Sequence, residues 1–350
     1  MLINLPYPRK SRAWNFRLLG LLTLLFCSLS FILSFKPNKN SQQLVAVPTA
    51  DLSEAMSGEL KVLTYNVAGL PQIISSAKTP RASSIRSIGQ RINHFDIVNV
   101  QEDFNYNEFL YADNSHPYRT EAMGTIPFSD GLSTLSKYPI VAIERVAWKD
   151  CSGADCLTPK GFSYTRMELS KGVFLDVYNI HATAQDNKDA IVARKQNLLQ
   201  FAAYVKQHSD GEAVLIMGDF NAHYTFSEDN IRDFKKETGM IDGWVEVKNR
   251  GEIPEVVSGF KARLALDIDE ACESIDKIYF RGSSKLSMIP KGYRVEKELF
   301  QTKEGAALSD HCAISMAFRW EIIEKQEESS APEVSLLNAA REQTYADAKL

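Results

Sequence analysis

The segment at residues 217–224 reads MGDFNAHY and directly follows the apolar run AVLI at residues 213–216. A buried strand that ends in this way presents a carboxylate, Asp219, and an amide, Asn221, on the same side of an extended chain. Neither group is stable in an apolar core without a partner. The spacing therefore predicts that both side chains act on something outside the sheet.

Five other strand-like runs carry an acid, an amide or an imidazole at one end. These residues are Asn66 in LKVLTYN, Glu102 in DIVNVQE, His181 in FLDVYNIH, Asp276 in SIDKIYF, and Asp310 with His311 in SDHCAISMAF. Each has an ordinary structural explanation of its own, such as a turn residue, a solvated loop acid or a hydrogen-bonded core histidine. Together they predict one site, because strand ends at one edge of a sheet hold side chains more rigidly than loops do.

The side chains of this set are carboxylates, amides and imidazoles, with no thiolate. Such ligands suit Mg²⁺ or Mn²⁺ better than a structural zinc ion. A divalent cation beside histidines and a carboxylate that can orient water is typical of phosphoryl transfer, in which positioning and charge stabilisation supply most of the rate.

The elements that must position these residues are mostly strands. Strand-like runs occupy 59–68, 96–102, 131–137, 140–148, 162–169, 173–181, 213–219, 275–281 and 311–320, whereas helical periodicity appears at 80–94 and 187–208. Strands outnumber helices, and the two do not alternate regularly. The order predicts an α/β fold in which sheets pack on each other and helices lie outside.

Composition and charge are those of a globular protein. The chain has 350 residues, of which 44% are hydrophobic and 24% charged, and its formal net charge is −4. Residues 1–40 contain six basic residues and no acid. The remaining 34 basic and 44 acidic residues therefore give residues 41–350 a net charge of −10. This negative charge does not indicate a domain that binds nucleic acid without sequence preference.

The first 58 residues predict export. A basic region at 1–17 precedes the uncharged run LLGLLTLLFCSLSFILSF at 18–35, which is either a cleaved signal or a short membrane anchor. An anchor is favoured, since the only small-residue cleavage pattern, SLS at 28–30, lies inside the run. Basic residues before the run place the rest outside the cytoplasm, anchored or, after cleavage, secreted. We expect a linker at 36–58, a catalytic domain at 59–320 and a polar tail at 321–350.

Cysteine usage agrees with export. Cys151 and Cys156 flank SGAD in a turn-rich stretch, and an oxidising compartment favours a local disulfide between them, although two unpaired loop cysteines would fit the same pattern. Cys272 and Cys312 can pair only if their segments adjoin, which the sequence leaves open. Cys27 lacks the small preceding residue expected of a lipidated cysteine.

Seven ordered motifs resemble the endonuclease/exonuclease/phosphatase superfamily, which has the deoxyribonuclease I-like fold. They are LKVLTYNVAGLP, VQED, GLSTLSKYPI, YNIHA, GDFNA, IDKIYF and LSDHCAI, and they cover roughly residues 59–320. NVAGLP and the short YNIHA are most similar to the neutral sphingomyelinase-like and secreted branches. The resemblance implies a four-layer sandwich of two packed mixed β-sheets flanked by helices. Cys312 departs from the aromatic residue or asparagine that many members carry there.

The resemblance also implies roles for the strand-end residues. Asp219 would orient or deprotonate the attacking water, and Asn221 would donate to a phosphoryl oxygen. Glu102, supported by Asn66, would be the principal metal ligand, and Asp310 would hold or tune the metal.

The histidines complete the implied site. His311, oriented by Asp276, and His181 would neutralise charge on the five-coordinate phosphorus. The sequence leaves open which of them protonates the leaving oxygen.

The resulting expectation is a Mg²⁺-dependent phosphodiesterase, with Mn²⁺ as an alternative, acting on a phospholipid head group in the manner of a sphingomyelinase C. An exported nuclease is disfavoured, because residues 41–320 carry 31 basic and 37 acidic residues and tracking of phosphates needs a basic groove. An inositol-phosphate phosphatase would need a dense Lys/Arg cluster that is not evident. An inactive binding module would not need the full set of site residues. The oligomeric state is left open.

Overall fold

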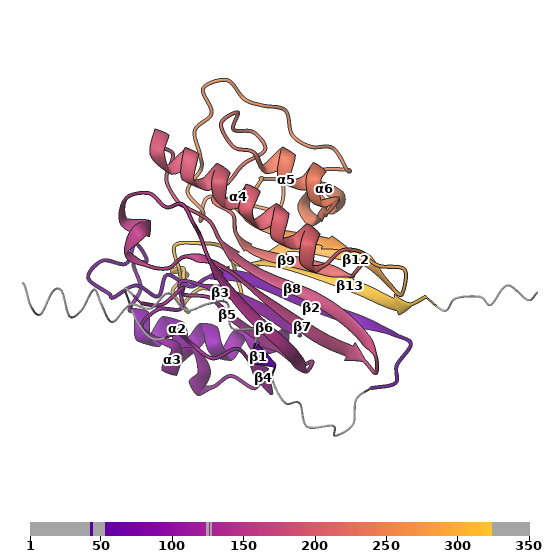
Figure 1. Cartoon of the computed structure of the whole chain (residues 1–350). Coiled ribbons are helices and arrows are strands. Elements are labelled where there is room, and N and C mark those ends of the chain that lie inside the picture. The colour runs from indigo at the N-terminus through magenta and orange to yellow at the C-terminus, as the bar shows by residue number, and fades with distance from the viewer. Residues whose placement is uncertain (1–42, 45–52, 124–125, 127, 324–350) are drawn as a thin grey trace, which may run out of the picture. The chain divides into compact units, whose positions relative to one another are not determined.

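Two β-sheets pack face to face in the computed structural model, and helices cover their outer faces (Figure 1). The structure describes residues 43–44, 53–123, 126 and 128–323. The predicted N-terminal apolar segment and most of the predicted tail lie outside these residues. Within the described part of the chain, no helix combines the length and the apolar character that crossing a bilayer requires.

Both sheets mix parallel and antiparallel pairs, as predicted. Among the described residues, the seven-stranded sheet has the order β1 (Gln43–Leu44), β6 (Ile140–Ala147), β7 (Gly161–Ser170), β8 (Val173–His181), β9 (Val214–Asp219), β11 (Asp276–Arg281) and β10 (Ile241–Asp242). The six-stranded sheet has the order β12 (Leu286–Val295), β13 (Ile314–Ile322), β2 (Ser57–Asn66), β3 (Ile97–Gln101), β5 (Ser133–Ser136) and β4 (Tyr118–Arg119). Only β2–β3 and β8–β9 are parallel pairs in these ladders. The predicted fold class is confirmed.

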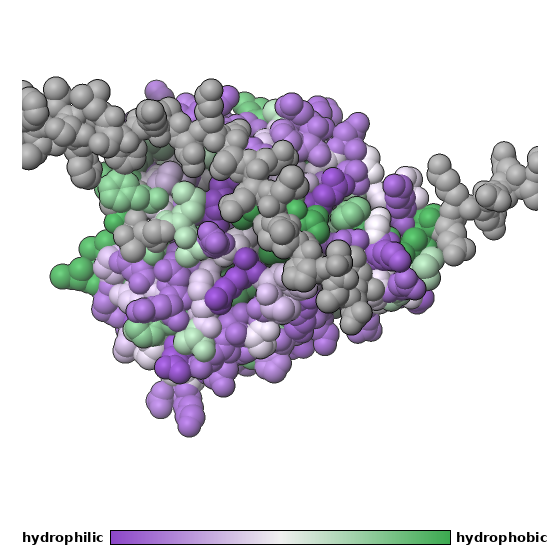
Figure 2. All heavy atoms as spheres, turned by 60° about the horizontal axis from the view of Figure 1, so that its bottom comes forward, coloured by the Kyte–Doolittle hydropathy of each residue, from purple (hydrophilic) through white to green (hydrophobic). Residues whose placement is uncertain are grey.

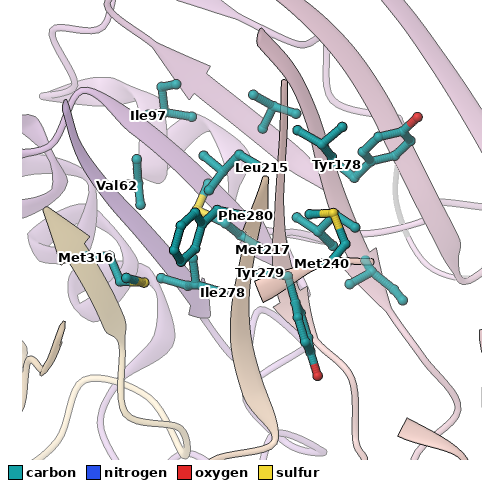
Figure 3. Packing of buried hydrophobic residues seen from close by; sticks show 14 of the residues in the cluster. Val62, Ile97, Tyr178, Leu215, Met217, Met240, Ile278, Tyr279, Phe280 and Met316 are labelled. Atoms are coloured by element: carbon teal, nitrogen blue, oxygen red, sulfur yellow. The ribbon is translucent and has the colours of Figure 1, made fainter. Parts of the chain in front are cut away.

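The core between the sheets follows from alternation along the strands. On β2, Val62 points into the space between the sheets, whereas Leu63 points to the outer face and packs in a second cluster. Figure 3 shows Val62 and Ile97 of one sheet facing Leu215 and Phe280 of the other. The same alternation turns Asn66, at the end of β2, toward the seven-stranded sheet.

The longest helix, α4 (Lys188–His208), covers the outer face of the seven-stranded sheet. Its N-cap Asn187 accepts a hydrogen bond from the backbone N–H of Ala190 at 3.1 Å. Phe201 packs against Phe162 and Tyr178 of the sheet, with ring centroids 4.8 and 5.6 Å away. Two shorter helices, α5 (Ile231–Thr238) and α6 (Gly243–Val247), follow in the chain between β9 and β11.

The six-stranded sheet is covered by α2 (Arg81–Arg91), which continues into the 3₁₀ turn η1 (Ile92–His94), and by α3 (Asn107–Ala112). Ile85, Ile88 and Ile92 form the buried stripe that the sequence predicts for residues 80–94, and they pack against Leu63 and Val98. The helices cover the outer faces of the sheets (Figure 1), and the predicted site residues lie at the strand ends.

Strand β12 was not predicted from the sequence. It contains Pro290 and Gly292, and the pairing register with β13 shifts between them. Because β12 is an edge strand, it tolerates a proline that a central strand would not. The short strands β1, β4 and β10 and the helices α3, α5 and α6 were also missed.

The predicted local disulfide between Cys151 and Cys156 is present. It closes the loop that contains the 3₁₀ turn η2 (Gly153–Leu157), between β6 and β7. Cys272 and Cys312 do not pair with each other; both are free, and Cys312 is buried.

Candidate active site

The predicted site residues lie at one edge of the packed sheets. His181 and Asp219 are register partners at the ends of the parallel strands β8 and β9. Asp276, the first residue of β11, is the antiparallel register partner of Asp219. Asn66 and Glu102 stand at the ends of β2 and β3 in the other sheet. Four strand ends and one strand start thus deliver these side chains to a common point.

Asn66 links the two sheets at this edge. Its amide Nδ2 lies 3.2 Å from Glu102 Oε1 and 3.3 Å from Asp219 Oδ2, so one amide donates to two carboxylates. Its Oδ1 accepts from the backbone N–H of Ala68 at 3.0 Å. Asn66 therefore positions the carboxylates with its nitrogen, while its oxygen holds the following loop.

Two histidines approach Asp219. The Oδ2 of Asp219 lies 3.6 Å from His181 Nε2 and 3.9 Å from His311 Nε2, and the backbone N–H of Asn221 donates to its Oδ1 at 2.9 Å. Nδ1 of His311 lies 2.8 Å from Asp276 Oδ2. Asp276 thus fixes the orientation of the His311 ring and leaves Nε2 turned toward Asp219.

The surroundings of Asp219 and His311 give the two side chains different charge states at neutral pH. Burial, followed by repulsion from Asp276, raises the pKa of Asp219 to about 7. Burial alone would lower the pKa of His311, but the charge and hydrogen bond of Asp276, with the charge of Asp219, raise it to about 10. His311 is consequently a cation at neutral pH, while Asp219 exchanges a proton near neutrality.

Lys160 lies among the candidate site residues and was not predicted from the sequence. Its Nζ lies 3.1 Å from His181 Nε2 and forms an ion pair with Asp155 at 2.7 Å. Burial, then the charges of Lys160 and His311, lower the pKa of His181 well below its ordinary value, so His181 is neutral. The sequence signal that could have identified Lys160 is its position directly before a strand. It was not used, because the pattern at the strand ends consists of acids, amides and imidazoles and does not include a lysine.

The disulfide loop supports Lys160 from outside. Asp155, which pairs with Lys160, lies next to Cys156 and also accepts a hydrogen bond from the backbone N–H of Ala184 at 2.8 Å. The loop closed by Cys151–Cys156 is thereby connected to the segment that follows His181.

Asn221 and Asp310 complete the predicted set. Asn221 donates from Nδ2 to the carbonyl of Ala182 at 3.2 Å. Asp310 Oδ1 lies 3.4 Å from Ser309 Oγ, and Ser309 Oγ also donates to the carbonyl of Asn66 at 2.7 Å. Segments that are 243 residues apart are joined by this bond.

The backbone is strained where it presents two of the site residues. Glu102 has φ +59° and Asn221 has φ +49°, in a region that residues other than glycine adopt rarely. Gly69 packs closely against the backbone of Glu102. A Cβ atom on Gly69 would lie only 2.1 Å from the carbonyl oxygen of Glu102. The fold therefore holds both side chains in conformations that local preference does not favour.

Buried amides beneath the site hold the two sheets in register. Nδ2 of Asn99 on β3 donates to the carbonyls of Tyr178 and Met217, at 2.8 and 3.2 Å. Nε2 of Gln101 donates to Asn179 Oδ1 at 2.7 Å. These bonds run between the sheets and so fix the position of Glu102 relative to His181 and Asp219.

A divalent cation could be held at one of two places, a cluster of three residues or the carboxylate of Glu102. Ligand atoms of Asp219, Asp276 and His311 all lie within 4.8 Å of one another. However, His311 is protonated and bound to Asp276, and a protonated imidazole is not a ligand. Glu102 is the better candidate, because its carboxylate has Asn66 as its hydrogen-bond donor and its pKa is raised by burial and by the charge of Asp310. A half-buried carboxylate whose charge is destabilised by the charge of Asp310 fits a cation.

Comparison with known proteins gives the family. Residues 42–246 match the family described as Endonuclease/Exonuclease/phosphatase family 2. The chain belongs to this family, as the motifs predicted.

One relative and two solved structures illustrate the likeness. A protein of Mycobacterium bovis named Sphingomyelinase is 35% identical over 275 residues, which are 77% of this chain and 54% of that protein. This chain thus spans about half the length of the relative. Beta toxin from Staphylococcus aureus, crystallised as a mutant with bound magnesium ions, matches with a TM-score of 0.51 and 19% identity, over 74% of this chain and 99% of the other. TDP2 of D. rerio, complexed with single strand DNA product, matches with a TM-score of 0.55 and 16% identity, over 74% and 98%. At these identities, the two structures establish the fold.

Proposed function

We propose that this chain is a divalent-cation-dependent phosphodiesterase that hydrolyses the head group of a phospholipid, as a sphingomyelinase C does. The observation that carries the proposal is the position of Asp219 between Asn66, His181 and His311 at the shared strand edge. A carboxylate with a pKa near 7, in contact with neutral and cationic donors, has what activation of water at a phosphate requires.

Asp219 is the base in this proposal. A water between Asp219 and the phosphate gives its proton to Asp219 Oδ2 as its oxygen attacks phosphorus. The bond to the leaving oxygen then breaks. Of the two histidines, only His311 carries a proton that it can give to the leaving oxygen, because His181 is neutral.

The donors around Asp219 stabilise the transition state. His311 and Lys160 supply positive charge, and the amide of Asn221 supplies a neutral hydrogen bond to a phosphoryl oxygen. Such groups are preorganised by their partners, Asp276 for His311 and Asp155 for Lys160. Little reorganisation is then needed when charge develops on the phosphate.

Glu102, whose carboxylate is under the charge of Asp310, would hold Mg²⁺, or Mn²⁺ as the alternative. A divalent cation bound there would neutralise phosphate charge in the transition state. Asn66 keeps the Glu102 carboxylate oriented for this role.

A phospholipid head group is the favoured substrate for two reasons. The M. bovis relative, at 35% identity, is named a sphingomyelinase. The net charge of −6 over residues 41–320 opposes the long phosphate tracking that nucleic acids require.

A substrate panel tests the proposal. The purified full chain is assayed with Mg²⁺, and separately with a chelator, on sphingomyelin, lysophospholipids, phosphoinositides, and single- and double-stranded DNA. We expect Mg²⁺-dependent release of phosphocholine from sphingomyelin as the fastest reaction. DNA hydrolysis that exceeds lipid hydrolysis would overturn the proposed substrate.

The location of the protein is also a proposal. We propose that the apolar run at 18–35 exports the catalytic domain and anchors it outside the cytoplasm. A cytoplasm-dependent reporter fused after Leu350 should therefore be inactive, and an active reporter would contradict this topology.

A further inference from the structure

Arg81 is a buried cation in an unfavourable position. Its side chain is 1% exposed, and it is the first residue of α2. The N-terminus of a helix carries partial positive charge, so a cation in the first turn destabilises the helix. Burial of a charge costs further free energy unless partners compensate for the lost water. The contacts of the Arg81 side chain must therefore offset both effects.

Solvent is available to arginine on the same helix. Arg86 of α2 has a side chain that is 57% exposed, and it pairs with Asp113 at 2.7 Å. Figure 2, in which the bottom of Figure 1 with α2 and α3 comes forward, shows a surface that is largely hydrophilic on this side. Arg81 nevertheless lies inside the fold, so its position is not a consequence of a lack of polar surface.

The guanidinium of Arg81 is held by backbone oxygens. In the described part of the chain its partners are carbonyls and one hydroxyl rather than carboxylates. Nη2 donates to the carbonyl of Val67 at 2.6 Å, and Nε donates to that of Ala68 at 3.0 Å. Nη1 donates to the carbonyl of Leu308 at 2.9 Å and lies 3.4 Å from the carbonyl and 3.3 Å from the hydroxyl of Thr79. One planar fork thus joins two segments that are far apart in the sequence.

The first of these segments, residues 66–69, contacts Glu102 twice. Asn66 donates to the Glu102 carboxylate and holds the backbone N–H of Ala68. Ala68 has φ +49°, a strained conformation for a residue with a side chain, and its carbonyl accepts from Arg81. Gly69 then packs against the backbone of Glu102. A displacement of this segment would therefore move Glu102.

The second segment, residues 308–310, ends at Asp310. Leu308, whose carbonyl accepts from Arg81, comes directly before Ser309. Ser309 Oγ donates to the carbonyl of Asn66 at 2.7 Å and lies 3.4 Å from Asp310 Oδ1. The two segments are thus bonded to each other directly and also through Arg81.

The charge of Arg81 acts on the carboxylates that these segments position. Burial lowers the pKa of Arg81, and the charges of Asp310 and Glu102 are among those that raise it. A guanidinium stays protonated in spite of such effects. Since the charge of Asp310 also destabilises the Glu102 carboxylate, the cation beneath them offsets part of this repulsion.

We propose that Arg81 is a positioning residue of the candidate active site, which fixes residues 66–69 relative to residues 308–310 so that Glu102 and Asp310 can act together on one divalent cation. The inference rests on the proposed function, because that function assigns the two carboxylates to the cation. Arg81 acts through the two segments and not by contact with the substrate.

Hydrogen exchange of the full chain tests the joining of the segments without any metal. The variant is Arg81→Lys, which keeps the charge but replaces a planar fork of five donors by one ammonium group. We expect amide exchange in residues 66–70 and 307–311 to become about tenfold faster, because the segments open more easily when their carbonyls lose a charged donor. Exchange that stays within twofold of wild type in both segments would overturn the proposal.

Arg281→Lys is the matched control. Arg281 also donates to two backbone carbonyls, that of Thr238 at 3.0 Å and that of Ser209 at 2.6 Å. It ends β11, whose first residue is the site residue Asp276, so it lies at the other end of that strand. The control should leave exchange in both segments within twofold of wild type.

Calorimetric titration with Mg²⁺ tests the effect on the cation and does not depend on activity. Arg81→Lys should raise the dissociation constant of Mg²⁺ about tenfold, and Arg281→Lys should leave it within twofold. Thr79→Val is a milder variant, since the Thr79 hydroxyl donates to the carbonyl of Ala307 at 3.1 Å and lies beside Arg81. It should raise both exchange and the dissociation constant about threefold, and it decides the question if Arg81→Lys does not fold.

The outcomes separate a positioning role from general stability. Faster exchange with unchanged Mg²⁺ binding would make Arg81 a structural residue and overturn the proposal, as would equal weakening of Mg²⁺ binding by Arg281→Lys. A wild type that binds no Mg²⁺ would overturn the proposed cation dependence and, with it, the role of Arg81 toward the cation. The exchange measurement would still show whether Arg81 joins the two segments, so the two failures are distinguishable.

Discussion

Asp219 and Asp276 are register partners on the antiparallel strands β9 and β11, yet only Asp276 is hydrogen-bonded to a cationic histidine. His311 Nδ1 lies 2.8 Å from Asp276, whereas His311 Nε2 is 3.9 Å from Asp219. Two buried acids on neighbouring strands thus have different tasks. Asp276 keeps His311 charged, and its repulsion adds to burial in raising the pKa of Asp219.

Glu102→Gln should change the dependence on metal. The amide keeps the size of the side chain and its contact with Asn66, but it removes the charge that would hold Mg²⁺. We expect the Mg²⁺ concentration for half-maximal activity to rise at least tenfold, with a lower maximal rate. Titration of activity with Mg²⁺ measures both quantities. A variant with an unchanged half-maximal concentration would show that Glu102 is not a metal ligand.

Lys160→Met should lower turnover per folded molecule. Loss of one preorganised donor at a developing charge commonly costs about 10²-fold in kcat. Lys137→Met is the matched control, since Lys137 pairs with Asp96 on the surface. The check is steady-state kinetics normalised to the folded fraction from circular dichroism. Wild-type turnover in folded Lys160→Met would remove Lys160 from the site.

The disulfide should affect both stability and turnover. Cys151→Ser combined with Cys156→Ser should lower the free energy of unfolding by about 2 kcal/mol, as expected for a short closed loop. Turnover should also fall, because Asp155 of this loop holds Lys160. A reductant should reproduce both effects in wild type and have none on the double variant. Loss of stability without loss of turnover would show that the loop does not support Lys160.

The main strands, and the meeting of the candidate site residues at their ends, were predictable from the sequence for a common physical reason. Apolar runs that end in Asn66, His181 or Asp219 combine strand periodicity with an unusual terminal residue, and both signals are local. Lys160 was missed because a lysine before a strand is ordinary until the fold places it 3.1 Å from His181. Strand β12 was missed because Pro290 interrupts its alternation, which only its edge position permits.

His223 makes stability depend on pH. Burial, then the charge of Lys277, lower the pKa of His223 to about 4. In the unfolded chain the ordinary pKa is about 6.5, so the unfolded state takes up a proton first as pH falls, and stability is lost between about pH 6.5 and pH 4. His223→Gln should remove about 2 kcal/mol of the stability difference between pH 7.5 and pH 5. Urea unfolding of both proteins at both pH values measures this. An equal pH dependence in the two proteins would contradict the lowered pKa.

The most direct measurement is the rate of Mg²⁺-dependent phosphocholine release from sphingomyelin by wild type and by Asp219→Asn, together with the Tm of each. The account predicts that the variant loses about 10² to 10⁴-fold in kcat, because the group that accepts the proton of water is removed. It also predicts an unchanged or higher Tm, because a buried carboxylate that Asp276 repels becomes neutral. A variant that keeps wild-type turnover, or one whose lost activity follows only from a lower Tm, would contradict the assignment of Asp219 as the base.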